Sequence, residues 1–185
     1  MEAKLKGIIL TAGDLAEFQI TEVPDGKRDV PVSTASPAAC QPVEDTRLDA
    51  YTPEPQATVR RYAVATRGDY RGVGSTITLA AFTPADAKQV MASVRAAVTA
   101  CGEGYAGGAL TFTQVSTVDS VPVGDEAVSF QLVGRGTQPT WYTIVRQGST
   151  LVRFASSTTS GQAGQVPTPL VVQQVMKLTA AASGS

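Results

Sequence analysis

The sequence contains no histidine. This removes the side chain that most often acts as a general base near neutral pH, the usual partner of a serine or cysteine nucleophile, and the commonest transition-metal ligand. Neither the Gly-x-Ser-x-Gly pattern nor the Ser-x-x-Lys pattern of serine nucleophiles occurs. We therefore expect no enzymatic activity, no metal and no cofactor.

Two further patterns resemble catalytic motifs only superficially. Asp125 and Glu126 are adjacent, and neighbours in a strand point to opposite faces, so we do not expect them to act on one bond as a glycosidase pair. We interpret them as a turn followed by the start of a strand. The glycine-rich residues 102–108 lack the Lys-Ser/Thr ending of a phosphate loop and are typical of a helix terminator and turn.

Four arginines fall inside predicted strands, namely Arg60, Arg61, Arg146 and Arg153. Arg60 shares a strand face with Tyr62, and Arg146 shares one with Tyr142. Guanidinium groups pair with carboxylates or phosphates, and tyrosines supply apolar area and a hydroxyl. We therefore predict that Arg60, Tyr62, Tyr142 and Arg146 contact a ligand of anionic or aromatic character in a cleft over an exposed sheet face. The alternative is a solvated outer face, and we expect Trp141 in the core.

The elements that position these side chains follow from periodicity and turn chemistry. Thr83, Pro84 and Gly102 give a helix over residues 84–101 its N-cap, first position and end, and Thr168-Pro169 begins a second long helix reaching about residue 181. A short helix is expected over residues 41–49. Strands are expected at residues 18–23, 59–67, 75–82, 110–115, 127–133, 141–146 and 150–156.

These elements predict an α/β (α+β) fold with a mixed, mainly antiparallel sheet of about six strands, packed on one side by the two long helices. The alternative fold is a Mog1/PsbP-like sandwich. We expect a single domain over residues 1–185, consisting of an N-terminal edge segment at 1–23, a proline-rich loop with a short helix at 24–55, and a core at 56–182.

Cys40 and Cys101 are the only cysteines. Cys101 falls on the apolar stripe of the predicted helix 84–101, and a disulfide between the two is their simplest use. Closing a loop of about 60 residues stabilises a chain by about 4 kcal/mol in the chain-entropy model. Two buried free thiols are the alternative.

The charge balance of 15 basic and 16 acidic residues leaves no excess positive charge for a phosphate backbone or an anionic bilayer. We expect no nucleic-acid partner, and no apolar run is long enough to cross a membrane. The N-terminal residues lack the pattern of a secretory signal, so we expect any such signal to have been removed.

The order of elements resembles the PknH-like extracellular sensor domain of receptor kinases and lipoproteins from high-GC Gram-positive bacteria. The resemblance rests on Phe82, Ala87 and Cys101 at the entry and end of the long helix, and on residues 124–130 and 145–152. It spans roughly Cys40 to Leu178. The kinase sensor has two disulfides and a tryptophan before the helix-ending cysteine, whereas this chain has two cysteines and Ala100 at that position.

The resemblance implies an extracytoplasmic α/β domain with a broad cleft for an unidentified ligand. We therefore expect a non-catalytic sensor or lipoprotein domain, secreted or lipid-anchored at the cell surface, that binds a small-molecule or cell-envelope ligand. A module that binds a membrane or cell-envelope protein is the alternative. An enzyme is the third reading and would require a carboxylate and a tyrosine, such as Tyr62 or Tyr142, in one pocket.

Overall fold

One antiparallel sheet organises the chain. The computed structural model describes residues 1–23, 33–158 and 164–183. Within them nine strands pair in the order β1-β3-β4-β9-β8-β7-β6-β5-β2, with every neighbouring pair antiparallel. The strands are β1 (Phe18–Glu22), β2 (Ala35–Ser36), β3 (Ala57–Ala65), β4 (Val73–Ala81), β5 (Tyr105–Gly107), β6 (Leu110–Thr117), β7 (Glu126–Gly134), β8 (Thr140–Gln147) and β9 (Thr150–Thr158).

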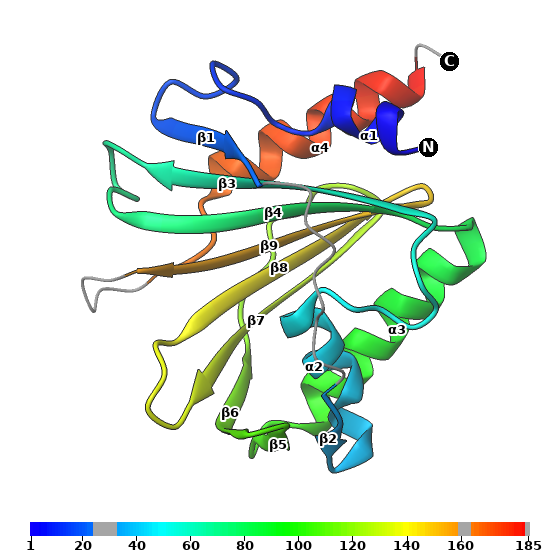
Figure 1. The fold of residues 1–185 in the computed structure, drawn as a ribbon, viewed down its shortest axis with the longest axis vertical. Helices are drawn as coiled ribbons and strands as arrows, with labels where there is room; N and C mark the ends of the chain where they lie inside the picture. The colour runs from blue at the N-terminus through cyan, green and yellow to red at the C-terminus, as the bar shows by residue number, and fades with distance from the viewer. Residues whose placement is uncertain (24–32, 159–163, 184–185) are drawn as a thin grey trace.

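The helices cover both faces of this sheet (Figure 1). Helices α1 (Glu2–Ile8) and α4 (Thr168–Ser183) pack on one side, which we call the α4 face. A short 3₁₀ turn (Ala38–Cys40), α2 (Gln41–Leu48) and α3 (Pro84–Ala100) pack on the other, which we call the α2 face. Each face has its own cluster of buried apolar side chains, because alternate residues of every central strand point to opposite sides.

The helix start that the capping residue and proline predict is present in the structure. Thr83 caps α3, accepting a hydrogen bond from the Asp86 amide N–H at 3.2 Å, and Pro84 occupies the first helical position. The predicted hairpin between residues 59–67 and 75–82 is β3–β4, with Arg60 opposite Thr78. The expected mainly antiparallel α/β fold is confirmed.

Two features of the expected architecture are wrong. The long helices do not share one side of the sheet, since α3 packs on the α2 face and α4 on the α4 face. The described sheet also has nine strands rather than about six. The strands that the sequence did not predict are β2 and β5, which are two and three residues long and pair with each other across distant segments of the chain.

The predicted disulfide joins Cys40 to Cys101, and both half-cystines are buried. It links the start of α2 to the residue that ends α3 and closes a loop with a sequence separation of 61. Helix α2 is therefore fixed covalently to the layer on which it packs. No helix in the described ranges is long and apolar enough to cross a membrane.

Candidate ligand-binding site

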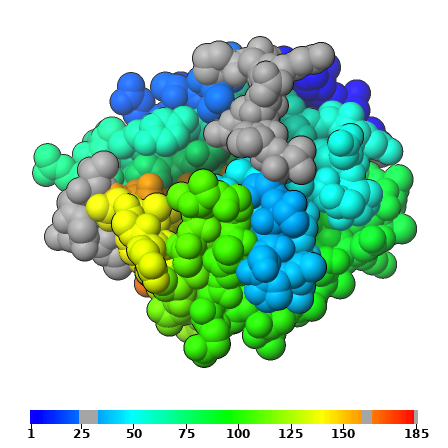
Figure 2. Space-filling view, turned by 60° about the horizontal axis from the view of Figure 1, so that its bottom comes forward, coloured from blue at the N-terminus to red at the C-terminus, as the bar shows by residue number. Residues whose placement is uncertain are grey.

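A groove of about 570 Å³ runs beside α2 on the α2 face. We call it the α2 groove. The residues that line it are Ser33, Thr34, Gln41, Asp45, Leu48, Asp49, Ala50, Tyr51, Thr52, Glu54 and Pro55. A second hollow of about 310 Å³ lies between α2 and α3 and shares Gln41, Asp45, Tyr51 and Thr52 with the groove. In the space-filling view α2 (light blue) lies at the surface, next to the cyan segment that follows it (Figure 2).

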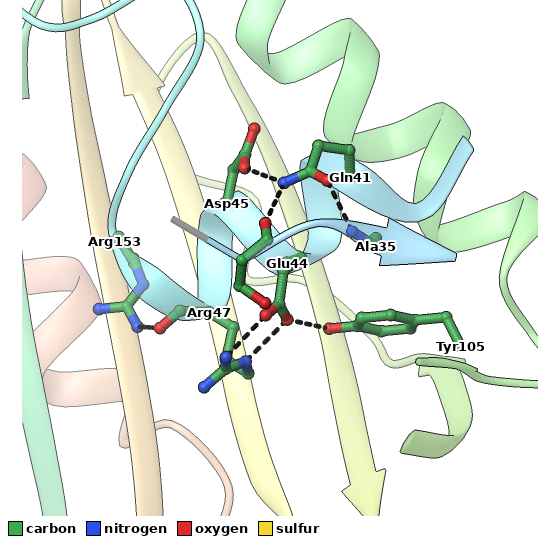
Figure 3. Close-up of polar contacts among 8 residues, drawn as sticks. Ala35, Gln41, Glu44, Asp45, Arg47, Tyr105 and Arg153 are labelled. Atoms are coloured by element: carbon green, nitrogen blue, oxygen red, sulfur yellow. Dashed lines mark hydrogen bonds and ion pairs between the residues drawn. The ribbon is translucent and has the colours of Figure 1, made fainter. Parts of the chain in front are cut away.

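Gln41 fixes the strand before α2 to the first turn of this helix (Figure 3). Its carbonyl Oε1 accepts from the Ala35 amide N–H at 2.7 Å, while its Nε2 donates to the Ser33 carbonyl at 2.9 Å and to Asp45 Oδ1 at 2.7 Å. Burial raises the pKa of the Asp45 carboxyl, and the hydrogen bond from Gln41 only partly opposes that effect. Asp45 is thus a half-buried carboxylate held in a fixed orientation at the edge of the groove.

Glu44 points from α2 into the protein and is fully buried (Figure 3). Its two carboxylate oxygens accept hydrogen bonds from Arg47 Nε at 2.8 Å and Nη2 at 2.7 Å, and its Oε2 also accepts from the Tyr105 hydroxyl at 3.0 Å. Burial, the largest single influence, would raise the pKa of this carboxyl, but the hydrogen bonds and charge of Arg47 together with the hydrogen bond from Tyr105 and further hydrogen bonding lower the pKa overall. A side chain at Gly107 would collide with this carboxylate, which explains the glycine there.

Asp49 ends α2 in the left-handed conformation, with φ of 61°, a conformation that aspartate tolerates better than most residues. Its side chain is only 1% exposed. Oδ2 accepts from Arg60 Nε at 2.6 Å and from Thr78 Oγ1 at 3.1 Å. Its other oxygen, Oδ1, is buried without a hydrogen-bond partner among the described residues.

Two more buried polar atoms close to Asp49, in Tyr51 and Arg153, also lack a hydrogen-bond partner among the described residues. The Tyr51 side chain is 4% exposed and its hydroxyl has no partner in the described ranges, and burial strongly raises its pKa. Arg153 is 5% exposed, donates from Nη2 to the Arg47 carbonyl at 3.1 Å and lies 5.2 Å over the Tyr142 ring, but its Nε is unpaired. Unpaired buried polar atoms are rare in proteins and call for an explanation such as a ligand.

The groove wall offers side chains for hydrogen bonding and ion pairing. In the described part of the chain no group of three or more acidic or cysteine side chains could hold a metal ion. Glu44, whose side chain is fully buried, accepts three hydrogen bonds from Arg47 and Tyr105 and has no exposed surface from which to exchange a proton with a ligand. The group open to a ligand at the groove wall is the half-buried carboxylate of Asp45, whereas the unpaired atoms of Asp49 and Tyr51 have no exposed surface.

The four residues predicted to contact a ligand lie on one sheet face, the α2 face. The strand register places Tyr62 and Tyr142 in one row across the sheet, through Thr76 and Ala155. On the same side of the sheet, Arg60 lies one row further along and Arg146 lies two rows further along. This arrangement was not predictable before the strand order was known.

The environments of these four residues differ. Tyr62 is 43% exposed, whereas Tyr142 is buried between the Phe130 ring at 5.0 Å and the Arg153 guanidinium. Arg60 pairs with Asp49, and Arg146 pairs with two carboxylates at the start of β7. None of the four lines the α2 groove. Their contact with a ligand stays a prediction, and Trp141 is buried as expected.

The carboxylates that bind Arg146 correct one step of the sequence reasoning. Asp125 Oδ2 lies 2.7 Å from Arg146 Nη1, and Glu126 Oε1 lies 2.6 Å from its Nε. The two neighbours were expected to point to opposite faces, but β7 begins at Glu126, so Asp125 belongs to the preceding turn and the strand rule does not apply to it. Their interpretation as a turn and a strand start holds.

Sequence reasoning missed the residues that line the α2 groove. A signal for them exists, because Gln41, Asp45 and Asp49 recur at a spacing of four through the predicted short helix and so form a polar stripe on one of its sides. Tyr51 offers no comparable signal, since its position depends on the loop that follows the helix.

The comparisons with known proteins agree with this architecture. No protein-family model and no curated protein matches the sequence. Among solved structures, the extracellular domain of PknH from Mycobacterium tuberculosis superposes with a TM-score of 0.62 at 13% identity, covering 100% of this chain and 97% of that one. A putative uncharacterized protein from Mycobacterium smegmatis, an orthologue of Rv0999, gives 0.42 at 14% identity, covering 98% and 93%. The resemblance to PknH in the sequence is thus confirmed in three dimensions, and this chain has the PknH-like sensor-domain fold.

Proposed function

We propose that this chain is a non-catalytic, extracytoplasmic sensor domain that binds its ligand in the α2 groove. The observation that carries the proposal is the groove itself, whose lining includes the half-buried Asp45 carboxylate and three residues that each hold a buried, unpaired polar atom, namely Ser33, Asp49 and Tyr51. Leaving such an atom unpaired costs about 1–3 kcal/mol, and a ligand that pairs it recovers this free energy. The fold of the PknH extracellular domain supports a sensing role.

The extracytoplasmic location is supported by the disulfide as well as by the fold. Disulfides persist in oxidising compartments and are rare in the cytosol. Cys40 and Cys101 are both buried, and their bond connects the two helices that flank the second hollow. Attachment to the cell surface through a lipid is the further expectation for a lipoprotein-type member of this fold.

The experiment that tests this proposal blocks the α2 groove with a large side chain. Ala50 is exposed and lines the groove, so an Ala50→Trp variant introduces a large ring there without disturbing a buried residue. Ala96 is equally exposed but lies on α3, outside the groove, and Ala96→Trp is the matched control. Ligands are first identified for the parent protein by ligand-detected NMR, using a library of neutral, cationic and anionic cell-envelope metabolites.

Ala50→Trp is expected to abolish binding of the identified compounds, with an unchanged melting temperature, and Ala96→Trp is expected to bind them normally. Equal binding by both variants would place the ligand elsewhere on the protein. A library with no binder of any charge would count against ligand sensing itself and favour a protein-interaction module.

A further inference from the structure

We infer that the ligand of the α2 groove is an organic cation whose amine or guanidine group binds the carboxylate of Asp45. The inference rests on the proposed function, because it specifies what the proposed groove binds. It follows from the charges at the groove wall, from the separation of its carboxylates, and from the polar atoms that lack partners.

The described groove wall carries acidic side chains and no basic ones. Asp45, Asp49 and Glu54 line it, and neither lysine nor arginine does. Asp49 is neutralised by Arg60, with 2.6 Å between Oδ2 and Nε. Asp45 receives a hydrogen bond only from the neutral amide of Gln41, and neither Asp45 nor Glu54 has an ion-pair partner in the part of the chain described. Two uncompensated carboxylates therefore favour a cation and disfavour an anion.

A metal ion does not fit this distribution of charge. Metal sites for hard cations gather several oxygen ligands around one point, and no such group of acidic side chains occurs in the described residues. The carboxylates of Asp45 and Glu54 come instead from different segments, one on α2 and one in the loop before β3. Charges placed along a groove of about 570 Å³ suit an organic molecule of the size of a sugar.

The unpaired atoms indicate a ligand that donates hydrogen bonds. Asp49 Oδ1 can only accept, and the Tyr51 hydroxyl can both donate and accept. Asp45 also keeps acceptor capacity after binding Gln41. Ammonium and guanidinium groups are donors without acceptors, and hydroxyl groups on the ligand would match the hydroxyls of Ser33, Thr34 and Thr52 along the wall. A polar amine therefore matches the Asp45 carboxylate, and it reaches Asp49 Oδ1 and the Tyr51 hydroxyl only if these buried atoms turn toward the groove.

The experiment compares ligands that share a shape but differ in charge. The ¹⁵N-labelled protein is titrated with glucosamine, N-acetylglucosamine and glucuronate, which are cationic, neutral and anionic, and with the cations spermidine and agmatine. Backbone amide shifts over residues 41–52 report groove binding. Asp45→Asn keeps an oxygen to accept from Gln41 but removes the charge, and Asp69→Asn removes an exposed acid from the β3–β4 turn as the matched control.

Glucosamine is expected to shift the groove amides at lower concentration than its neutral and anionic counterparts. Asp45→Asn should weaken glucosamine binding about tenfold, in line with the loss of one hydrogen bond to a charged group, while Asp69→Asn leaves it unchanged. Glucuronate binding in the groove as tightly as glucosamine would overturn the cation inference and leave the proposed function standing. Failure of all three cations to shift these amides also overturns it, whatever the metabolite library finds.

Discussion

The two faces of the sheet differ in how their buried polar side chains are paired. On the α4 face, Gln174 Oε1 accepts from the Leu10 amide N–H at 2.9 Å and its Nε2 donates to the Ile8 carbonyl at 3.1 Å. Buried hydroxyls on this face pair across neighbouring strands, as Ser75 does with Ser156 at 2.7 Å. On the α2 face, each of four residues keeps an unpaired buried atom, namely Ser33, Asp49, Tyr51 and Arg153.

Under the proposed function, this difference separates a stabilising face from a ligand-binding one. Complete pairing gives buried polar groups their best free energy, and incomplete pairing is an uncompensated penalty in the absence of a ligand. In the described residues, the unpaired buried atoms occur only on the α2 face. The same face carries the disulfide and the hydrogen bond from Tyr105 to Glu44, which connect α2 to α3 and to β5. Experiments can therefore ask whether the two faces respond independently.

Breaking the disulfide is expected to have the largest effect, and to act on one face only. Replacing Cys40 and Cys101 by serine should lower the free energy of unfolding by about 4 kcal/mol, because the unfolded chain regains the freedom of a long loop. Amide hydrogen exchange is expected to quicken in α2, which the bond ties to α3, while α4 keeps its protection. Equal loss of protection in both helices would show that the two faces unfold as one unit.

The Glu44 carboxylate gives the next largest effect. Glu44→Gln places an amide against Arg47 and should destabilise the protein by about 3 kcal/mol, the typical result of breaking a buried ion pair. Urea titration measures this change. A Gln174→Glu variant on the α4 face is the matched exchange in the opposite direction, and it should leave ligand binding in the α2 groove unaltered.

The same variant carries a pH signature. The pKa of Glu44 is lowered in the folded protein from its ordinary value of 4.5, so its contribution to stability is complete above that value and disappears as the pH falls through the folded value. The parent protein should therefore lose stability more steeply than Glu44→Gln on acidification below about pH 4.5. Parallel pH profiles for the two proteins would mean that Glu44 does not titrate differently in the two states.

The elements with local signals could be predicted from the sequence, and those with non-local causes could not. Thr83 and Pro84 fix the start of α3 by themselves, whatever lies around it. The face on which a helix packs depends instead on the path of the chain around the sheet, which is why α3 and α4 were assigned to one side. β2 and β5 are short and pair Ala35 with Gly107, a contact that no local sequence pattern predicts.

The candidate site shows the same limit. Arginines in strands were interpreted as free cations for a ligand, but Arg60 and Arg146 bind carboxylates supplied from outside their own strands, by the end of α2 and by the start of β7. Side-chain type and strand alternation could not reveal these partners, and the contact of Arg60 and Arg146 with a ligand stays a prediction. The stripe formed by Gln41, Asp45 and Asp49 was visible in the sequence, yet its importance depends on the groove beside it.

The smallest predicted effect has an unusual sign and tests the comparison most directly. Tyr51→Phe removes a buried hydroxyl that has no partner among the described residues, so it should stabilise the unliganded protein, by about 1 kcal/mol. Tyr105→Phe removes a hydroxyl of similar burial that donates to Glu44 at 3.0 Å, and it should destabilise the protein by about the same amount. Two identical chemical changes on one face are thus expected to shift the denaturation midpoint in opposite directions. If Tyr51→Phe also weakens binding of the groove ligand, then the parent protein is less stable than the variant because it keeps a hydroxyl that ligand binding requires. A Tyr51→Phe variant that is less stable than the parent would show that the hydroxyl is already paired, and the α2 face would then be as complete as the α4 face.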